Sequence, residues 1–120
     1  MFEVEFYYNK NGQSEIVDYL DKLYDRGKTS KNDRVNHDKI LAYIGLLELH
    51  GTYIGEPVVK YIDDSLWELR PLKNRIFFFH WKNNKFVLLH HFIKKVKKTP
   101  AREIRIAKTK LKDHIERLGE

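Results

Sequence analysis

The stretch LWELRPLKNR, residues 66–75, places two arginines where they could bind a single phosphate group. Its turn signal PLKN predicts that Arg70 and Arg75 flank a turn and face each other across two antiparallel strands. The same register puts Glu68 on the face that carries Arg70. A guanidinium presents parallel N–H donors that match paired phosphate oxygens, so two of them on rigid strands favour a phosphate site. The alternative is an exposed Glu68–Arg70 ion pair, which would contribute little.

A second group of cations follows the apolar strand FVLLHHFI and consists of Lys94, Lys95, Lys97 and Lys98. Strand alternation places Lys94 and Lys95 on opposite faces. Crowded ammonium groups repel one another and lower their pKa values, so one of these lysines could act as general acid or base near neutral pH. Thr99 and Pro100 predict a helix N-cap and a first-turn proline, which add partial positive charge. The alternative is an ordinary lysine-rich loop.

Aromatic residues lie between these two groups, and most of them are expected in the core of so small a protein. The rings are Phe77, Phe78, Phe79, Trp81, Phe86 and Phe92. Exposed rings could instead stack on RNA bases. His90 and His91 suggest a metal, but adjacent residues of a strand point to opposite faces and cannot both bind one ion. No motif for phosphate loops, serine hydrolases or zinc proteases occurs, so we expect no metal and no cofactor.

Composition limits the classes of protein that the 120 residues can form. The length suits a single domain over 1–120, and neither cysteines nor an apolar run of about 20 residues occur, which excludes disulfides and argues against a membrane helix. The first residues carry no basic leader, so a cytoplasmic protein without membrane association is expected. Net charge is +6, and residues 71–100 hold 8 basic residues and no acid. That asymmetry favours a polyanionic partner, although a solvated basic face is the simpler reading.

Periodicity predicts an α+β fold. A strand at 2–8 precedes two amphipathic helices, one at 15–26 capped by Ser14 and one from Ser30 to Gly51. The helices should form an antiparallel hairpin. Strand periodicity follows at 58–62, 66–72, 75–82 and 85–95, with Asn83–Asn84 as a two-residue turn and the last strand central. A final helix carries an apolar stripe of Ile104, Ala107, Leu111, Ile115 and Leu118. We expect an antiparallel sheet of three or four strands with the helices on one side.

The sequence resembles the RelE/HigB superfamily of type II toxins, in the HigB-like branch also found in phage genomes. The resemblance is carried by Glu68–Leu69–Arg70, Arg75–Ile76–Phe77–Phe78, Leu88–Leu89–His90, Phe92–Ile93–Lys94–Lys95, Lys98–Thr99–Pro100 and Glu103–Ile104. These motifs cover roughly residues 66–107, and the expected order of strands and helices agrees with the toxin fold along the whole chain. The chain departs from some relatives in having no tyrosine near its C-terminus, because its last tyrosine is Tyr61.

The resemblance implies a ribosome-dependent, metal-independent mRNA endoribonuclease that inhibits translation. The implied chemistry is attack of a 2′-hydroxyl on the adjacent phosphate, with Arg70 and Arg75 stabilising the phosphate charge. Lys94, Lys95 or Lys98 is then base or acid, and Glu68 orients an arginine or acts as base. A cognate HigA-like antitoxin with a helix-turn-helix domain is the implied partner, and contact with operator DNA would occur only through it.

Two other functions fit the same resemblance. A ParE-like toxin would poison DNA gyrase through a binding surface and would need no cleavage centre. A non-catalytic phage-derived protein could keep the scaffold for RNA binding or a structural role. The packed Arg and Lys residues favour cleavage over gyrase poisoning, and a neighbouring reading frame for a helix-turn-helix antitoxin would count against the non-catalytic alternative.

Overall fold

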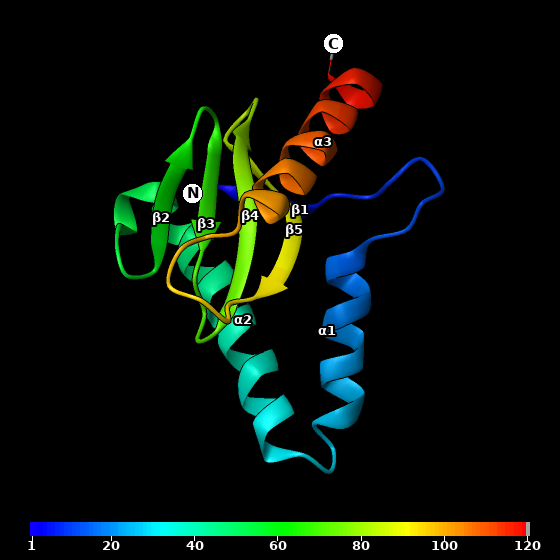
Figure 1. The fold of residues 1–120 in the computed structure, drawn as a ribbon, viewed down its shortest axis with the longest axis vertical. Coiled ribbons are helices and arrows are strands. Elements are labelled where there is room, and N and C mark those ends of the chain that lie inside the picture. The colour runs from blue at the N-terminus through cyan, green and yellow to red at the C-terminus, as the bar shows by residue number, and fades with distance from the viewer. Residues whose placement is uncertain (120) are drawn as a thin grey trace.

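A computed structural model describes residues 1–119 and confirms the α+β architecture. The elements follow one another as β1 (Glu3–Phe6), α1 (Glu15–Arg26), α2 (Lys31–His50), the 3-10 turn η1 (Gly51–Ile54), β2 (Val59–Asp63), β3 (Leu66–Leu69), β4 (Asn74–Trp81), β5 (Lys85–Ile93) and α3 (Ala101–Leu118) (Figure 1). The predicted helical hairpin is present as α1 and α2, which run side by side. Within the described residues, no helix has the length and apolar character needed to cross a bilayer.

The sheet is mixed and has five strands in the order β1-β5-β4-β3-β2. Strands β2 to β5 form the expected antiparallel meander, and β5 is an interior strand as predicted. The expectation of only three or four strands is corrected by β1, which pairs in parallel with β5 from Glu3↔Lys85 to Phe6↔Leu88. Parallel neighbours require a long crossover, and the α1–α2 hairpin with the antiparallel strands supplies it.

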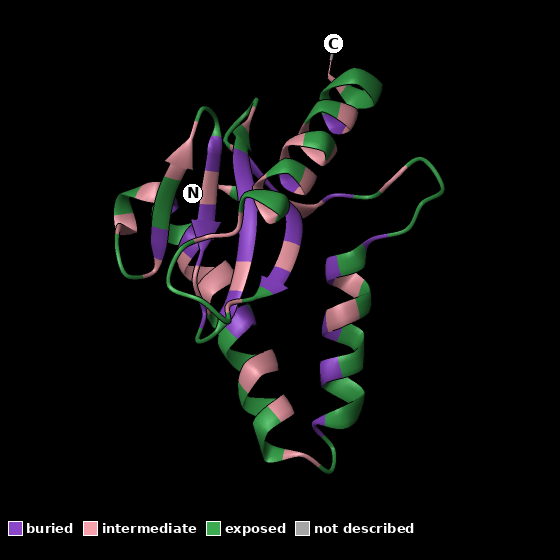
Figure 2. Ribbon diagram, viewed as in Figure 1, coloured by how far each residue is buried: buried purple, intermediate pink, exposed green. Residues whose placement is uncertain are grey.

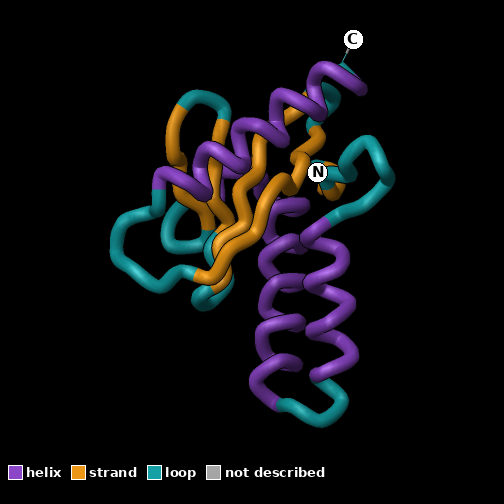
Figure 3. The backbone as a smooth tube through the Cα atoms, turned by 45° about the vertical axis from the view of Figure 1, so that its right-hand side comes forward, coloured by secondary structure: helices purple, strands orange, loops and turns teal. Residues whose placement is uncertain are grey.

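Helices cover both faces of the sheet, so the expectation that all helices lie on one side is wrong. Figure 3 shows the strands between the α1–α2 hairpin and α3. Successive residues of β4 belong to different cores, because Phe78 packs with residues of α1 and α2 whereas Phe77 and Phe79 pack with α3 residues. Strands apolar on both faces need cover on both faces, and β4 is buried along most of its length (Figure 2).

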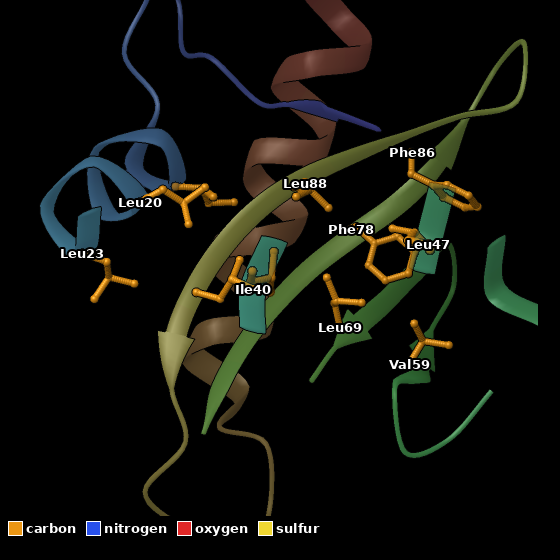
Figure 4. Close-up of a cluster of buried hydrophobic side chains, with 11 residues drawn as sticks. Leu20, Leu23, Ile40, Leu47, Val59, Leu69, Phe78, Phe86 and Leu88 are labelled. Carbon is orange, nitrogen blue, oxygen red and sulfur yellow. The ribbon is translucent and has the colours of Figure 1, made fainter. Parts of the chain in front are cut away.

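The first core lies between the α1–α2 hairpin and the sheet. Leu20 and Leu23 of α1 and Ile40 and Leu47 of α2 point toward the strand residues that Figure 4 labels, which are Val59, Leu69, Phe78, Phe86 and Leu88. The hairpin continues past the end of the sheet, where its residues are mostly exposed (Figure 2).

The second core lies under α3 and confirms only the first part of the predicted helical stripe. Ala107 is fully buried, and Ile104 and Leu111 pack against the same cluster. Ile115 and Leu118 are exposed instead, and His114 takes the inward position between the rings of Tyr7, Phe79 and Trp81. A spacing of three from Leu111 selects His114, whereas the predicted spacing of four selected Ile115.

Helix caps follow the sequence signals at α1 and α2 but not at α3. The Ser14 and Ser30 hydroxyls accept hydrogen bonds from the backbone N–H groups of Val17 and Asp33, and Gly51 ends α2 with φ +61°. At α3 the cap is Pro100, with no side-chain hydrogen bond, and Ala101 is the first helical residue. The expectation of a Thr99 cap with proline at the first helical position is therefore wrong by one residue.

The β4–β5 hairpin differs from a regular one in its loop and in its register. The connecting loop is Lys82–Asn84, one residue longer than the expected turn, with Asn83 and Asn84 both at positive φ. The register shifts between Phe77↔His90 and Phe78↔Leu88, which leaves Leu89 as the extra residue of a β-bulge. Because of the bulge, Leu88 packs with the first core while His90 lies on the side of α3.

Candidate functional site

The β3–β4 hairpin brings Arg70 and Arg75 together as the sequence predicts. The register pairs Glu68 with Phe77 and Leu69 with Ile76, so the two arginines are the next opposed positions. The PLKN turn closes through a hydrogen bond from Asn74 N–H to the Pro71 carbonyl at 3.0 Å, with Leu72 at φ +59°. A non-glycine residue in this left-handed region is uncommon, so surrounding contacts must hold the turn.

Glu68 is a buried carboxylate between the arginines, not the exposed ion pair that was the alternative. Its side chain is 1 % exposed, while those of Arg70 and Arg75 are 19 % and 11 % exposed. Glu68 Oε1 lies 3.5 Å from Arg70 Nε and 3.9 Å from Arg75 Nε, and none of these three atoms has a hydrogen-bond partner. The Glu68 carboxylate therefore attracts both guanidinium groups by charge alone, and through Oε1 it takes up none of their N–H donors.

Arg75 is fixed by the backbone of its own turn. Its Nη1 donates hydrogen bonds to the carbonyls of Leu72 and Asn74 at 2.7 and 2.8 Å. Burial and the neighbouring charge of Arg70 lower the pKa of the Arg75 guanidinium, and Glu68 opposes that shift. An anion arriving here would relieve the repulsion between the two arginines.

Lys94 is the lysine that joins this site. Desolvation and the charges of Arg75 and Arg70 lower its pKa, with Glu68 acting in the opposite direction. The predicted direction is thus confirmed for Lys94, but the charges responsible are mainly guanidinium groups rather than neighbouring lysines. We call Glu68, Arg70, Arg75 and Lys94 the arginine cluster. Lys95, Lys97 and Lys98 lie beyond the end of β5 and are exposed.

The chain after β5 covers the arginine cluster on its way to α3. In Figure 1 this loop passes across the ends of β4 and β3 before α3 begins. The Thr99 hydroxyl lies 3.5 Å from Glu68 Oε2 and donates to it. Thr99 therefore contacts the buried carboxylate and does not cap α3.

A buried amide anchors the turn that carries the arginines. Asn74, the first residue of β4, is 1 % exposed, and its Oδ1 accepts hydrogen bonds from the Tyr19 hydroxyl at 2.9 Å and from His91 Nε2 at 3.0 Å. Its Nδ2 donates to Asn36 Oδ1 at 2.8 Å and to the Pro71 carbonyl at 3.1 Å. Asn74 thus links the turn to α1, α2 and β5, which is a role that sequence reasoning missed.

His90 is a second buried polar centre that the sequence did not reveal. Its Nε2 lies 2.7 Å from Glu103 Oε1 of α3, and its Nδ1 lies 2.9 Å from Glu15 Oε1 of α1. Lys110 Nζ lies 3.4 Å from the same Glu15 oxygen. The hydrogen bond with His90 lowers the pKa of Glu15 to about 2, helped by the Lys110 charge. The network ties the starts of α1 and α3 to β5.

The two adjacent histidines point to opposite faces, as expected. His91 stacks on Tyr19 of α1 with ring centroids 4.0 Å apart, whereas His90 contacts α3. Along residues 1–119 no group of three or more His, Asp or Glu side chains has an arrangement that would hold a metal ion. The phenylalanines of the aromatic group are buried, which confirms their core role, and Trp81 lies under Lys82 and Lys85.

Lys60 is a further cation that sequence reasoning passed over. Lys60 lies opposite Glu68 in the register of β2 and β3. Its charge is one of those that lower the pKa of Lys94. Strand alternation could have placed it, because VVKYI was expected to be a strand.

Comparison with known protein families assigns the chain to a family. The family model described as Phage derived protein Gp49-like (DUF891) matches residues 18–112, a span that includes the whole arginine cluster. No match to the chain was found among curated proteins. Because the model covers most of the chain, the protein belongs to the phage-derived Gp49-like family, a family of RelE-like, toxin-like proteins.

Proposed function

We propose that the protein is the toxin of a type II toxin–antitoxin system, of the HigB-like kind, and that it cleaves mRNA on the ribosome. The observation that carries the proposal is the arginine cluster, in which two partly exposed guanidinium groups lie over one buried carboxylate. Its three cations exceed its one anion, the nearby turn and loop add only lysines, and the one further carboxylate beside it is the exposed Glu56, 3.9 Å from Arg70 Nη1. Such a site suits a single phosphate diester whose negative charge increases during the reaction.

The proposed reaction needs only groups of the RNA and of the chain. The 2′-oxygen forms a bond to the adjacent phosphorus while the bond from phosphorus to the 5′-oxygen breaks, giving a 2′,3′-cyclic phosphate and a 5′-hydroxyl. The proton of the 2′-hydroxyl goes to a base, and an acid protonates the leaving 5′-oxygen. Arg70 and Arg75 donate to the phosphate oxygens and stabilise the charge of the phosphorane.

Lys94 is the best-placed residue for one of the two proton transfers. Its lowered pKa brings it nearer to neutrality, and it lies in the field of both arginines. Glu68 is enclosed by Arg70, Arg75 and Thr99, so orienting the arginines suits it better than proton transfer. Lys95 and Lys98 remain candidates only as exposed groups of the neighbouring loop.

A cognate antitoxin is part of this proposal. The basic half of the chain would attract an acidic antitoxin segment over the arginine cluster, and a HigA-like helix-turn-helix domain would provide any contact with operator DNA. The cytoplasm, where mRNA and ribosomes meet, is the compartment that this function requires.

The test is to map mRNA 5′ ends after the protein is expressed in cells. We expect codon-registered cuts with wild type, and loss of the cuts with Arg70→Ala because a phosphate ligand is gone. Arg26→Ala, at the far end of α1, removes the same charge away from the site and should cut normally. Unchanged cuts with a folded Arg70→Ala/Arg75→Ala protein would refute the proposal. DNA damage without cuts would indicate gyrase as the target instead.

A further inference from the structure

A shallow, wide-open hollow of about 620 Å³ lies beside Arg75 on the surface of the molecule. The residues around it are Lys73, Arg75, Lys94, Lys95, Val96 and Lys97. Five of the six are cations and none is acidic. They come from two segments, the turn between β3 and β4 with the start of β4, and the loop that follows β5. We call this feature the lysine hollow.

The lysines of the hollow have no anionic partner among residues 1–119, which is also true of Lys10 and Lys39, and what distinguishes them is that they gather around one concavity. Lys85 pairs with Glu5, Lys108 with Asp63, Lys110 with Glu15 and Arg117 with Asp113. In contrast, the side chains of Lys73, Lys95 and Lys97 form no ion pair or hydrogen bond with any of the residues 1–119. Uncompensated charges gathered around one concavity favour an anionic ligand.

The two segments are fixed to each other. The backbone N–H of Lys94 donates to the Lys73 carbonyl at 2.8 Å, which joins the loop after β5 to the turn before β4. Asn74 anchors that turn through hydrogen bonds to Asn36 and Tyr19. The backbone that carries the lysines is therefore held in place.

Arg75 and Lys94 belong to both the arginine cluster and the lysine hollow, so the two sites are continuous. A strand of RNA whose reacting phosphate lies on Arg70 and Arg75 would carry a neighbouring phosphate into the hollow. Val96 is the only apolar residue of the lining, so the hollow offers little to the apolar anchors with which peptides usually bind.

We propose that the lysine hollow is a second phosphate subsite, which holds the RNA backbone next to the phosphate that reacts. The inference rests on the proposed function and assigns Lys73, Lys95 and Lys97 to binding the strand. Lys95 then contributes to affinity and register rather than to proton transfer. The subsite reads no base, because lysines contact only the backbone.

The test measures binding of a 2′-O-methyl RNA octamer, in which the attacking hydroxyl is blocked and cleavage cannot occur. Lys73→Gln/Lys97→Gln should weaken binding about tenfold at about 50 mM salt, and the slope of log affinity against log salt should fall by about 0.7 for each lysine. Lys10→Gln/Lys39→Gln removes the same charge from exposed positions remote from the hollow. This control should change affinity by less than about twofold.

Equal weakening in the two double variants would overturn the inference, as would a wild type that binds no RNA. An oligoglutamate peptide serves as the other polyanion. If its binding falls in Lys73→Gln/Lys97→Gln while RNA binding does not, the hollow receives an acidic protein segment and the inference is wrong. The proposed cleavage is judged separately. If the protein cuts mRNA in cells but Lys73→Gln/Lys97→Gln has no specific effect on octamer binding, only the subsite proposal is refuted. If that variant specifically weakens octamer binding but the protein makes no cuts in cells, only the cleavage proposal is refuted.

Discussion

Glu68 of β3 and Arg70, the residue that follows this strand, lie side by side, with Oε1 and Nε 3.5 Å apart and neither atom hydrogen-bonded. Arg75 stands in a similar relation to the same oxygen at 3.9 Å. One buried carboxylate thus holds two guanidinium groups by charge, while Arg75 Nη1 is used by the carbonyls of its own turn and Nη2 of each arginine has no such partner among residues 1–119. In this arrangement Glu68 would position the arginines and the arginines would bind the phosphate, and the two roles can be tested separately.

We predict that Glu68→Gln lowers the rate of RNA cleavage about tenfold. The variant removes the negative charge that orients the two guanidinium groups, but it leaves both arginines in the site. Arg70→Ala should cost about 100-fold or more, since a phosphate ligand is removed. The measurement is kcat as a function of pH in a ribosome-dependent cleavage assay. A positioning role leaves the shape of the pH profile unchanged in Glu68→Gln. Loss of the acidic limb of that profile would identify Glu68 as the general base and contradict us.

The relation between Glu68, Arg70 and Arg75 could be predicted from sequence because it is local. A four-residue turn sets the register of the hairpin, and the register sets which side chains share a face. The β-bulge at Leu89 lies in the β4–β5 pair, so it does not disturb the register between β3 and β4.

The contacts that the sequence did not predict are long-range. Glu15 and His90 are 75 positions apart, and nothing in the local pattern of either indicates that they meet. A strand that is apolar on both faces shows that both faces are covered but not which helix covers each. The burial of His114 instead of Ile115 also depends on where α3 meets the sheet.

Asn74→Ala should destabilise the fold by about 2–4 kcal/mol, because it leaves the side chains of Tyr19, His91 and Asn36 without their hydrogen-bond partner. The measurement is the free energy of unfolding in urea. Tyr19→Phe removes only one of these hydrogen bonds and should cost about 1 kcal/mol. Equal losses in the two variants would show that Asn74 is not the centre of the network.

Acid should destabilise the protein in two successive windows. Burial lowers the pKa of His91 from 6.5 to about 4, so the unfolded chain binds more protons than the folded one within that interval. Stability is therefore complete above pH 6.5 and falls as the pH drops to 4, by up to about 3 kcal/mol. Burial lowers the pKa of His114 and acts in the same direction. Glu15 extends the loss from pH 4.5 toward 2, where its own pKa lies.

The check is urea unfolding of wild type and His91→Gln across the upper window. Glutamine can still donate to Asn74 Oδ1 but cannot take up a proton, so the stability of the variant should depend less on pH between 6.5 and 4. Parallel curves for the two proteins would show that His91 does not cause the acid sensitivity.

Gly51→Ala should destabilise the protein by about 1–3 kcal/mol, for two reasons that act at one position. The residue ends α2 at φ +61°, which side chains with a Cβ rarely adopt, and an added Cβ would lie 2.6 Å from the Phe2 ring. Gly45 provides the matched control, because it lies within α2 and an added Cβ would meet nothing within 4 Å. Gly45→Ala should raise stability by about 0.5–1 kcal/mol, since alanine favours the helix and restricts the unfolded chain. Thermal and urea unfolding of the two variants measure the difference, and a Gly51→Ala protein as stable as wild type would mean that α2 ends differently from the structure described.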